Sequence, residues 1–386
     1  MPMIANASDA LHDRRSDPAE SITLFLCGDV MLGRGVDQIL PHPGDPRIHE
    51  PQASSAMTYV ELAEKAYGPI PRPVDFSYVW GDALAALQQA RPHVRIVNLE
   101  TSITRSADYL PKGINYKMSP DNVACLSAAK VDCCAVANNH VLDWGRPGLV
   151  ETLETLEHAG IRTVGAGRNA AAAEALAVLE IVGGTRVLVF AFGSTTSGIP
   201  EDWAAGDNRP GVNLLDELSA GAIARVARQA QALRRPGDIL VASIHWGENW
   251  GYKIPDEQRT FAHGLIDMAG FDIVHGHSSH HAKAIELYQQ KPILYGCGDF
   301  LNDYEGIVGY EAYRDDLAIM YLPKIAASDG RLLGLTLIPF LIRRFRLSRA
   351  AREDAAWLQR TLERESAGFG VRVALNEDLS LTVSPR

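Results

Sequence analysis

Stretches of β-branched and other apolar residues alternate with helical patterns along this chain, and that alternation restricts its fold more than any other feature. "SITLFLCGD" (residues 21–29) predicts a buried strand, and "GLVETLETLEHAG" (residues 148–160) predicts an amphipathic helix that ends at Gly160. Strands that alternate with helices form sheets layered by helices, so the predicted fold class is α/β. The same patterns predict strands at residues 94–100, 131–140, 161–167, 238–246, 271–277 and 291–300, a hairpin at 176–193 turning at Gly183-Gly184, a long strand or hairpin at 332–347, and helices at 77–90, 119–130, 217–233, 255–270 and 352–366.

Six of these predicted strands end in polar residues that can do chemistry. Open α/β sheets bind ligands where the carboxyl ends of their strands meet, because the loops there surround one crevice. Taken singly, such a residue is more often a helix cap or a solvated side chain. Six together indicate one shared site. They are Asp29, Glu100, the run Asn138-Asn139-His140, His245, the pair His275 and His277, and Asp299.

The positions of these residues also bear on domain organisation. They extend from residue 29 to residue 299 of 386, so two independent domains would separate them, and we expect one domain over residues 21–386. Residues 1–20 are expected to be a disordered lead-in, and a strand and helix extension is expected from about residue 346. Residues 40–76 are rich in proline and weakly periodic, which favours a loop-like insertion that covers a substrate as a lid.

Composition and charge argue against several functions. The formal net charge of −10 disfavours nucleic acid as a partner. Five arginines and no acid in residues 341–352 are a local exception, either a receptor for an anionic substrate or a solvated strand edge. Five cysteines spread along the chain do not form a disulfide framework and indicate a reducing, cytoplasmic location. The apolar run at residues 22–27 is too short for a membrane span, so no membrane anchor is expected.

Six short motifs surround the predicted strand ends. In chain order they are "GDVMLGR" (Gly28–Arg34), "NLETSIT" (Asn98–Thr104), "ANNHVLDWG" (Ala137–Gly145), "SIHWGENW" (Ser243–Trp250), "GHSSH" (Gly276–His280) and "YGCGDF" (Tyr295–Phe300). Together they resemble the motifs of the CapA family, which is named for poly-γ-glutamate capsule synthesis. The resemblance covers about residues 22–345. It implies a layered αββα sandwich related to the calcineurin-like metallophosphoesterases, with mixed sheets flanked by helices.

That resemblance implies two metal positions in this sequence, a first one that keeps most of its ligands and a second one that is weakened. A second metal position would keep only Asp29, Glu100 and His280, because Met31 stands where a ligand histidine is typical and a thioether binds such ions poorly. His280 is preferred to His281 because neighbouring side chains of an extended segment diverge. The expectation is therefore one divalent metal or none, and not a two-metal site. The first position would keep an N/O set suited to Zn²⁺ or Mn²⁺: Glu100, Asn139, His245 and His277.

The same residues predict acid–base chemistry. Without a tightly bound metal, Asp29 and His277 would act as acid and base on opposite faces of a substrate Cα, with His140 and Glu248 as supporting or alternative groups. With one metal, His140 would instead protonate a leaving group. Asp143, three residues after His140, would either orient that imidazole or cap the next helix.

Three residues are predicted to bind substrate. Trp246 and Trp250 flank Glu248 and would wall a groove, although buried packing explains a tryptophan at least as well. Lys117 stands where members of the CapA family tend to carry a basic residue before a proline-containing turn, so the resemblance implies that it meets a substrate carboxylate, with a plain surface lysine as the alternative. Asp299 lies where members of the CapA family often carry Asn, so the resemblance implies that it supports the ligands without binding the ion itself.

Three functions follow from these patterns. The leading one is a soluble CapA-type enzyme doing acid–base chemistry, metal-assisted where a metal binds, on a peptide-like substrate. Cα epimerisation of a residue in natural-product peptide tailoring is an example. One alternative is a metal-dependent hydrolase of a phosphoester or an amide. Another is an accessory protein of poly-γ-glutamate capsule synthesis with a polyglutamate-like partner. Nothing in the sequence specifies the oligomeric state.

Overall fold

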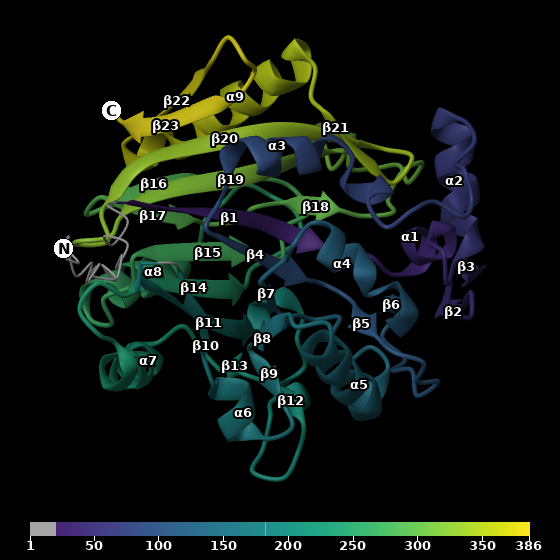
Figure 1. Ribbon diagram of the computed structural model, residues 1–386, viewed down its shortest axis with the longest axis horizontal. Helices are drawn as coiled ribbons and strands as arrows, with labels where there is room; N and C mark the ends of the chain where they lie inside the picture. Colours follow the sequence, from purple (N-terminus) through teal and green to yellow (C-terminus); the bar gives the residue numbers. More distant parts are fainter. Residues whose placement is uncertain (1–20, 182) are drawn as a thin grey trace, which may run out of the picture.

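Two β-sheets pack against each other, and helices cover them (Figure 1). The computed structural model describes residues 21–181 and 183–386, so the lead-in expected at residues 1–20 lies outside the described residues. None of the helices within those ranges combines the length and the apolar character that crossing a bilayer requires. The predicted α/β class, with mixed sheets flanked by helices, is confirmed.

The first sheet has ten strands and is built around β1 (Ser21–Val30). β1 pairs in parallel with β4 (Val94–Leu99) and β18 (Asp299–Leu301), and antiparallel with β19 (Leu317–Ala326). The carboxyl ends of β1 and β4 therefore lie side by side. The remaining strands are β7 (Cys133–Ala135), β8 (Arg162–Val164), β20 (Leu332–Arg343), β21 (Arg346–Arg349), β22 (Val371–Leu375) and β23 (Leu381–Pro385).

The second sheet has seven strands with a parallel centre. β11 (Arg186–Ser194), β14 (Ile239–His245) and β15 (Ile273–His277) run parallel in that order. β10 (Ala177–Glu180) pairs antiparallel with β11, as the predicted hairpin requires. The sheet is completed by β13 (Leu214–Leu215), β16 (Ile285–Tyr288) and β17 (Lys291–Leu294). Short two-stranded sheets are formed by β2 (Arg47–Glu50) with β3 (Ala53–Ser55), β5 (Ser102–Ile103) with β6 (Lys117–Met118), and β9 (Ala166–Gly167) with β12 (Gly211–Val212).

Several helices bury their apolar sides on the outer faces of the two sheets, whereas α9 (Arg352–Ser366) places Leu358 and Leu362 in the core between the sheets. Leu87, Leu126 and Leu149, from three different helices, share one core with the first sheet, and Ile223 and Phe261 share another with the second. The helices are α1 (Arg34–Ile39), α2 (Met57–Tyr67), α3 (Asp82–Ala90), α4 (Ala124–Ala128), α5 (Gly145–His158), α6 (Ala170–Glu174), α7 (Ala220–Leu233), α8 (Asp256–Asp267) and α9 (Arg352–Ser366).

The position of β1 between two cores explains its unbroken apolar sequence. Leu24 and Leu26 face the core between the sheets, whereas Phe25 and Cys27 face the core under the helices. A strand buried on both faces needs apolar residues at every position rather than at alternate ones. Asp29 continues the same buried strand, so its carboxylate enters the protein with no exposed face.

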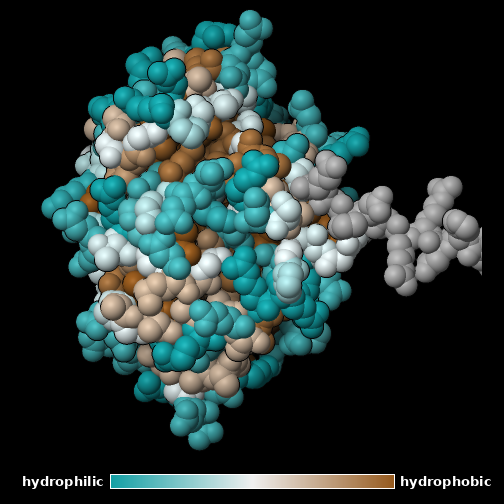
Figure 2. Space-filling view, turned by 90° about the vertical axis from the view of Figure 1, so that its left-hand side faces the viewer, coloured by the Kyte–Doolittle hydropathy of each residue, from teal (hydrophilic) through white to brown (hydrophobic). Residues whose placement is uncertain are grey.

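The carboxyl ends of β1, β14 and β15 point toward the same side of the molecule, on the right of these strands in Figure 1. Figure 2 shows the side from which these strands start. Its surface is mostly hydrophilic, with a hydrophobic area in the upper half.

Several predicted elements differ from the observed ones. The helix predicted at residues 77–90 is divided, because Gly81 has a φ of +43° and α3 starts only after it. The strand predicted at 131–140 is limited to β7, and the residues after it form the turn that carries Asn139 and His140. The strand predicted at 291–300 divides into β17 and β18 in different sheets.

The insertion at residues 40–76 is not the loop-like segment that its composition predicted. It forms the β2–β3 hairpin and α2. Glu50 of β2 and Asp303 both pair with the buried guanidinium of Arg34, and Tyr59 of α2 lies against the same group, 3.7 Å from its carbon to the ring centre. A buried charge with two partners fixes this insertion to the body of the protein. The predicted C-terminal extension is likewise part of the fold, because β21, β22 and β23 extend the first sheet.

Candidate metal and acid–base site

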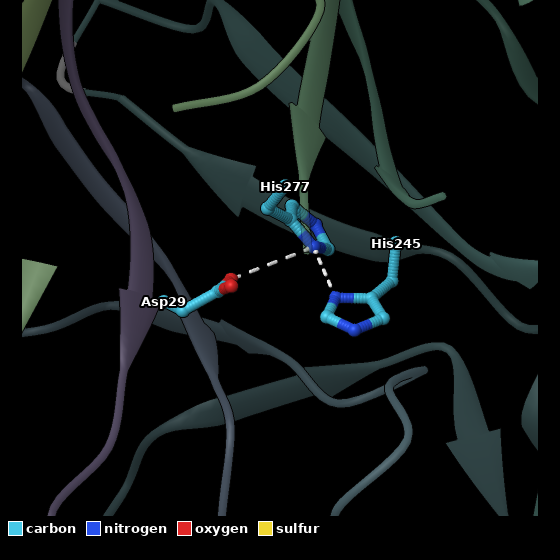
Figure 3. A group of neighbouring side chains, drawn as sticks. All are labelled: Asp29, His245 and His277. Atoms are coloured by element: carbon cyan, nitrogen blue, oxygen red, sulfur yellow. Dashed lines mark hydrogen bonds and ion pairs between the residues drawn. The ribbon is translucent and has the colours of Figure 1, made fainter. Parts of the chain in front are cut away.

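Strand ends from both sheets meet in one place. In the first sheet the register places Asp29 beside Asn98 of β4 and beside Asp299 of β18. In the second sheet it places His245, the last residue of β14, beside His277, the last residue of β15. Since the sheets face each other, carboxylates from one and imidazoles from the other line a shared site (Figure 3).

Asp29 is buried and held by two donors. Its Oδ1 accepts a hydrogen bond from Asn98 Nδ2 at 2.7 Å, and its Oδ2 accepts one from the backbone N–H of Ser278 at 3.2 Å. Burial and then the charge of Asp299 raise the pKa of Asp29 to about 7. A proton or a cation is therefore favoured at this carboxyl group near neutral pH.

A chain of hydrogen bonds determines which nitrogen of His277 carries its proton. Burial lowers the pKa of His275 to about 4, so its ring is neutral at pH 7, and its Nε2 donates to the carbonyl oxygen of Cys27 at 2.7 Å. His275 Nδ1 then accepts from Ser243 Oγ at 3.2 Å, and Ser243 Oγ accepts from His277 Nε2 at 2.9 Å. Burial also lowers the pKa of His277. The ring is therefore neutral, and the Nδ1 lone pair faces the site.

His245 presents a second lone pair to the same point. Its Nε2 donates to Asn139 Oδ1 at 3.0 Å, which leaves Nδ1 without a proton in the neutral ring. Burial lowers the pKa of His245 well below its usual value, so the neutral form dominates. Its Nδ1 lies 2.9 Å from His277 Nδ1, which in turn lies 3.9 Å from Asp29 Oδ1 (Figure 3). Three potential metal-ligand atoms thus converge, and each has an unshared electron pair.

Asp29 belongs to a second group with His280 and Asp299, whose donor atoms all lie within 4.8 Å of one another. His280 Nδ1 donates to Asp299 Oδ1 at 3.0 Å, and although burial opposes it, the Asp299 charge raises the pKa of His280. Asn302 Nδ2 donates to the other oxygen of Asp299 at 2.8 Å. Asp299 is therefore a potential ligand, and not a supporting residue as expected. It lies at the second metal position, which the presence of Met31 in place of a ligand histidine was expected to weaken.

The donor set fits a divalent metal. The atoms of Asp29, His245 and His277 lie within 4.8 Å of one another. Zn²⁺ binds nitrogen and oxygen at about 2.0–2.2 Å, which puts neighbouring ligand atoms roughly 3–3.5 Å apart. The observed separations of 2.9 and 3.9 Å lie on either side of that value. Both imidazoles also donate from their other nitrogen to a fixed oxygen, as metal-binding histidines commonly do.

The grouping differs from the one that the family resemblance implied. Asn139 Oδ1 and Glu100 Oε1 lie on the Nε2 side of His245, at 3.0 and 3.8 Å, while Nδ1 faces the other donors. Asn139 therefore orients His245 rather than sharing an ion with it. Glu100 is buried nearby, and burial, followed by the charges of Asp29 and Asp299, raises its pKa well above the usual range.

His140 is a second proton-accepting group at this site. Its Nδ1 donates to Asp143 Oδ2 at 2.7 Å, so Asp143 orients the ring, and its Nε2 lies 3.9 Å from Glu100 Oε1. Lys112 Nζ lies 2.7 Å from the other oxygen of Asp143. Burial lowers the pKa of His140 to about 4; Asp143 opposes this shift and Lys112 adds to it. His140 is therefore neutral at pH 7, with Nε2 free to accept a proton.

Two tyrosines connect the His140 side of the site to the His280 side. Tyr116 stacks on His140 with ring centres 3.9 Å apart. Its hydroxyl is 2.6 Å from that of Tyr304, whose ring lies edge-on to His280 at 5.3 Å. This wall keeps the two imidazoles in fixed positions.

The predicted substrate-binding residues have different environments. The prediction that Trp246 walls a groove is wrong: the side chain is 2% exposed and packs against Tyr295, whose carbonyl oxygen accepts its indole N–H at 3.0 Å. Trp250 is half-buried, stacks on Tyr310 at 3.9 Å and lies 5.3 Å from the ring of His280.

Glu248 and Lys117, the other two residues predicted for the site, have different surroundings. The Glu248 side chain is exposed, and within the described residues no hydrogen bond or ion pair joins it to the cluster. Lys117 Nζ lies 3.6 Å from the ring centre of Trp144 and 3.5 Å from the carbonyl oxygen of Ser106. Burial lowers the pKa of Lys117.

Sequence reasoning missed one residue of the site, Lys112, and it placed Asp299 at the site but not among the ligands. Lys112 follows no periodic pattern, so only its contact with Asp143 identifies it. Asp299 did have a signal, because Cys-Gly-Asp occurs twice, at residues 27–29 and 297–299, and the structure pairs the two copies. A Cβ on Gly28 would lie 1.7 Å from the carbonyl oxygen of Gly298, so this close pairing requires glycine.

Comparisons with known proteins agree with the motifs. The family model "Bacterial capsule synthesis protein PGA_cap" matches residues 23–304. A "Probable polyglutamine synthesis accessory protein" of Mycobacterium tuberculosis is 48% identical over 366 residues, covering 94% of this chain and 96% of that protein. The "PGA biosynthesis protein CapA" of Bacillus subtilis is 29% identical over 303 residues, covering 78% of this chain and 67% of that protein. The resemblance to the CapA family is thereby confirmed, and the chain belongs to the bacterial capsule synthesis protein family PGA_cap.

Proposed function

We propose that this chain is a metal-dependent hydrolase that cleaves an amide bond of a polyglutamate-like or other peptide-like chain. The observation that carries the proposal is the convergence of His245 Nδ1, His277 Nδ1 and Asp29 Oδ1. The names of the relatives, which refer to capsule and polyglutamine synthesis, favour an amide-linked polymer over a phosphoester as substrate. The paired sheets between helices support a relation to the calcineurin-like metallophosphoesterases.

Uncompensated negative charge supports a cation at this place. Asp29, Glu100 and Asp299 are all buried, and in the part of the chain that the structure describes, the only side chains forming ion pairs with them are histidines. A buried carboxylate without a cationic partner either binds a proton or requires a metal. The pKa of Asp29 is raised for the same reason, because its negative charge is buried close to that of Asp299.

Asp29, His245 and His277 would hold one Zn²⁺ or Mn²⁺, and Asp29 with His280 and Asp299 offers a second position. When bound, such a metal supplies a Lewis acid toward the substrate carbonyl and makes water a stronger nucleophile near neutral pH. Asp29 would be shared by both positions, since it belongs to both groups.

His140 is suited to move the proton. Its Nδ1–H is held by Asp143, so Nε2 can take a proton from the attacking water and return it to the leaving amide nitrogen. With a pKa of about 4, the imidazole starts the cycle as a base, and it can protonate the leaving group, the role expected from the sequence, only after it has taken the proton of the water. The proton gained by the amine is the one lost by the water.

Cα epimerisation is a second candidate, favoured by the pKa of about 7 at Asp29, which suits proton exchange at neutral pH. Its predicted pair is too close, however. A carbon placed between two acid–base groups needs about 3 Å on each side. Asp29 Oδ1 and His277 Nδ1 are only 3.9 Å apart, so they lie on the same face of any substrate.

The test is cleavage of γ-linked glutamate oligomers by protein of measured metal content. We expect bound Zn²⁺ or Mn²⁺, loss of cleavage in chelator, recovery on adding the metal, and at least a hundredfold lower rate in Asp29→Asn. Asp207→Asn, an exposed aspartate, is the matched control and keeps full activity. Undiminished cleavage by metal-free protein would rule out the metal-dependent reaction.

Running the same incubation in D₂O separates the alternatives. Deuterium at Cα without cleavage would favour epimerisation. Binding of the oligomer with neither cleavage nor exchange would favour an accessory role, as the name of the Mycobacterium tuberculosis relative describes for that protein.

A further inference from the structure

We infer that the β20–β21 hairpin and the end of α2 form an anion-binding subsite that holds carboxylates of the substrate chain beyond the catalytic cluster. The inference rests on the proposed function for the substrate class, a carboxylate-rich chain. It uses residues that the cluster does not, and it assigns the arginine-rich segment 341–352 a role.

The hairpin borders a hollow of about 370 Å³ with a cationic lining. Arg343 and Arg344 are exposed, and within the described residues neither forms an ion pair, while Arg346 makes only a 3.6 Å contact with Asp82. The guanidinium of Arg343 lies 4.5 Å from the ring centre of Tyr67. Guanidinium groups bind carboxylates through two parallel hydrogen bonds, so uncommitted arginines in a concavity suit a chain of carboxylates.

The turn that presents these arginines is held rigidly. Glu305 accepts the backbone N–H groups of Arg344 at 2.7 Å and Phe345 at 2.6 Å, and Tyr78 Oη donates to the carbonyl oxygen of Arg344 at 3.1 Å. The Phe345 side chain is fully buried. The arginine side chains therefore start from a fixed backbone, which reduces the entropy lost when they bind a ligand.

The same turn carries backbone strain. Arg344 and Phe345 have φ values of +56° and +55°, a region in which two-residue hairpin turns usually carry Asn and Gly. Non-glycine residues persist there only where the surrounding structure enforces it, and such strain concentrates at functional positions. Burial of the Phe345 side chain accounts for its unusual backbone conformation. Arg344 is exposed, and the hydrogen bonds that its backbone makes with Tyr78 and Glu305 hold it in this conformation.

A second hollow lies between this hairpin and two residues that contact the candidate active site. It has a volume of about 230 Å³ and is lined by Asn302 and Tyr304, which contact Asp299 and His280 of the cluster. Tyr67 lines both hollows, so the two adjoin. Figure 1 shows α2 and β21 on the side toward which β1 points. In this proposal, a chain bound at the cluster extends along the second hollow and past Tyr67 to the arginines.

The negative net charge of the protein means that a cationic subsite would favour binding of an anionic chain. The net charge of −10 repels a polyanion, and acidic side chains line the second hollow itself. Two of those acids are already engaged: Glu305 by the turn, and Asp316 by Arg314 at 2.7 Å. Uncommitted arginines at the far end offset the remaining repulsion.

The test measures binding of fluorescent γ-linked glutamate decamer and trimer to metal-free protein, so that no chemistry is needed. We expect the double variant Arg343→Glu/Arg344→Glu to raise the Kd for the decamer about tenfold or more, since each of its two substitutions removes a charge-assisted contact. The trimer, which offers fewer carboxylates and a shorter chain, is expected to depend less on these arginines and to bind both proteins nearly equally. The decamer affinity of the parent should fall as salt is added.

Arg360→Glu/Arg372→Glu is the matched control, with the same charge change at exposed arginines on α9 and β22. It is expected to bind the decamer like the parent. Equal decamer affinity in the parent and in the Arg343/Arg344 variant would overturn the subsite, whatever the cleavage assay shows. A polyphosphate of equal charge that binds through Arg343 and Arg344 when the decamer does not would also overturn it, because carboxylate is the chemistry proposed.

Discussion

The Nδ1 atoms of His245 and His277 lie 2.9 Å apart at the ends of adjacent parallel strands. Each ring donates its Nε2 proton outward, to Asn139 and to Ser243, so both unshared pairs point at each other and toward Asp29. Two lone pairs at this distance repel unless a proton or a metal ion lies between them. The arrangement is therefore maintained by the residues behind the imidazoles, and those residues can be tested.

Ser243→Ala removes the acceptor that fixes the His277 ring. The Ser243 hydroxyl joins His275 to His277, so its loss allows His277 to place its proton on Nδ1. Loss of such a supporting contact typically costs about 10–100-fold in metal affinity. We expect that loss in a competitive Zn²⁺ titration. Ser366→Ala, at a buried serine on α9, is the control and should bind Zn²⁺ like the parent; equal weakening in both variants would contradict the tautomer argument.

Lys112→Met tests the electrostatics of His140. The Lys112 charge helps to keep the pKa of His140 near 4, so its removal stabilises the imidazolium and raises that pKa. The acidic limb of the pH–rate profile, where His140 becomes protonated and can no longer act as a base, should move to higher pH. Lys324→Met, at an exposed lysine on β19, should leave the limb unchanged. An unshifted limb in Lys112→Met would exclude His140 as the base.

Asp29→Asn tests the buried carboxyl group through stability. The carboxyl titrates near 3.8 in the unfolded chain and at about 7 in the folded protein, so the folded state binds the proton more tightly between these values. The free energy of unfolding of metal-free protein should therefore fall as pH rises from 4 to 7, by at most about 4 kcal/mol from this group. The asparagine side chain of the variant cannot titrate, so the fall should be smaller there. Parallel dependence of the unfolding free energy on pH in the two proteins would contradict the raised pKa.

Much of the architecture could be predicted from sequence because both sheets are buried. β1, β4, β14 and β15 have apolar residues on both faces, which distinguishes them from helices. Boundaries were less predictable where a single residue determines them, as at Gly81 before α3. The insertion at 40–76 could not be predicted to fold, because its order depends on the pairing of Glu50 with Arg34, sixteen residues away, and on the pairing of Arg34 with Asp303, much farther along the chain.

The candidate site was predictable in membership but not in arrangement. Strand ends converge by a general rule, so Asp29, His245 and His277 could be grouped from sequence. Which nitrogen each imidazole turns toward the site depends on Cys27, Ser243 and Asn139, and no spacing encodes that. Trp246 was misjudged because alternation along β14 continues one residue beyond the strand and turns the indole into the outer core.

Gly28→Ala tests whether close contact of two strands creates the shared carboxylate position. A Cβ at residue 28 would lie 1.7 Å from the carbonyl oxygen of Gly298, a backbone atom that cannot rotate away, so β1 and β18 must separate. Overpacking of this kind typically costs about 1–3 kcal/mol. Because Asp29 and Asp299 are the next residues on these strands, their separation should also weaken metal binding. Gly334→Ala, on β20 with no heavy atom within 4 Å of the added Cβ, is the matched control. The control should be neutral or slightly stabilising, since alanine restricts the unfolded chain. Denaturant unfolding and Zn²⁺ titration of both variants provide the measurement. If Gly28→Ala lost stability but bound Zn²⁺ like the parent, the metal position would not depend on the approach of the two Cys-Gly-Asp segments.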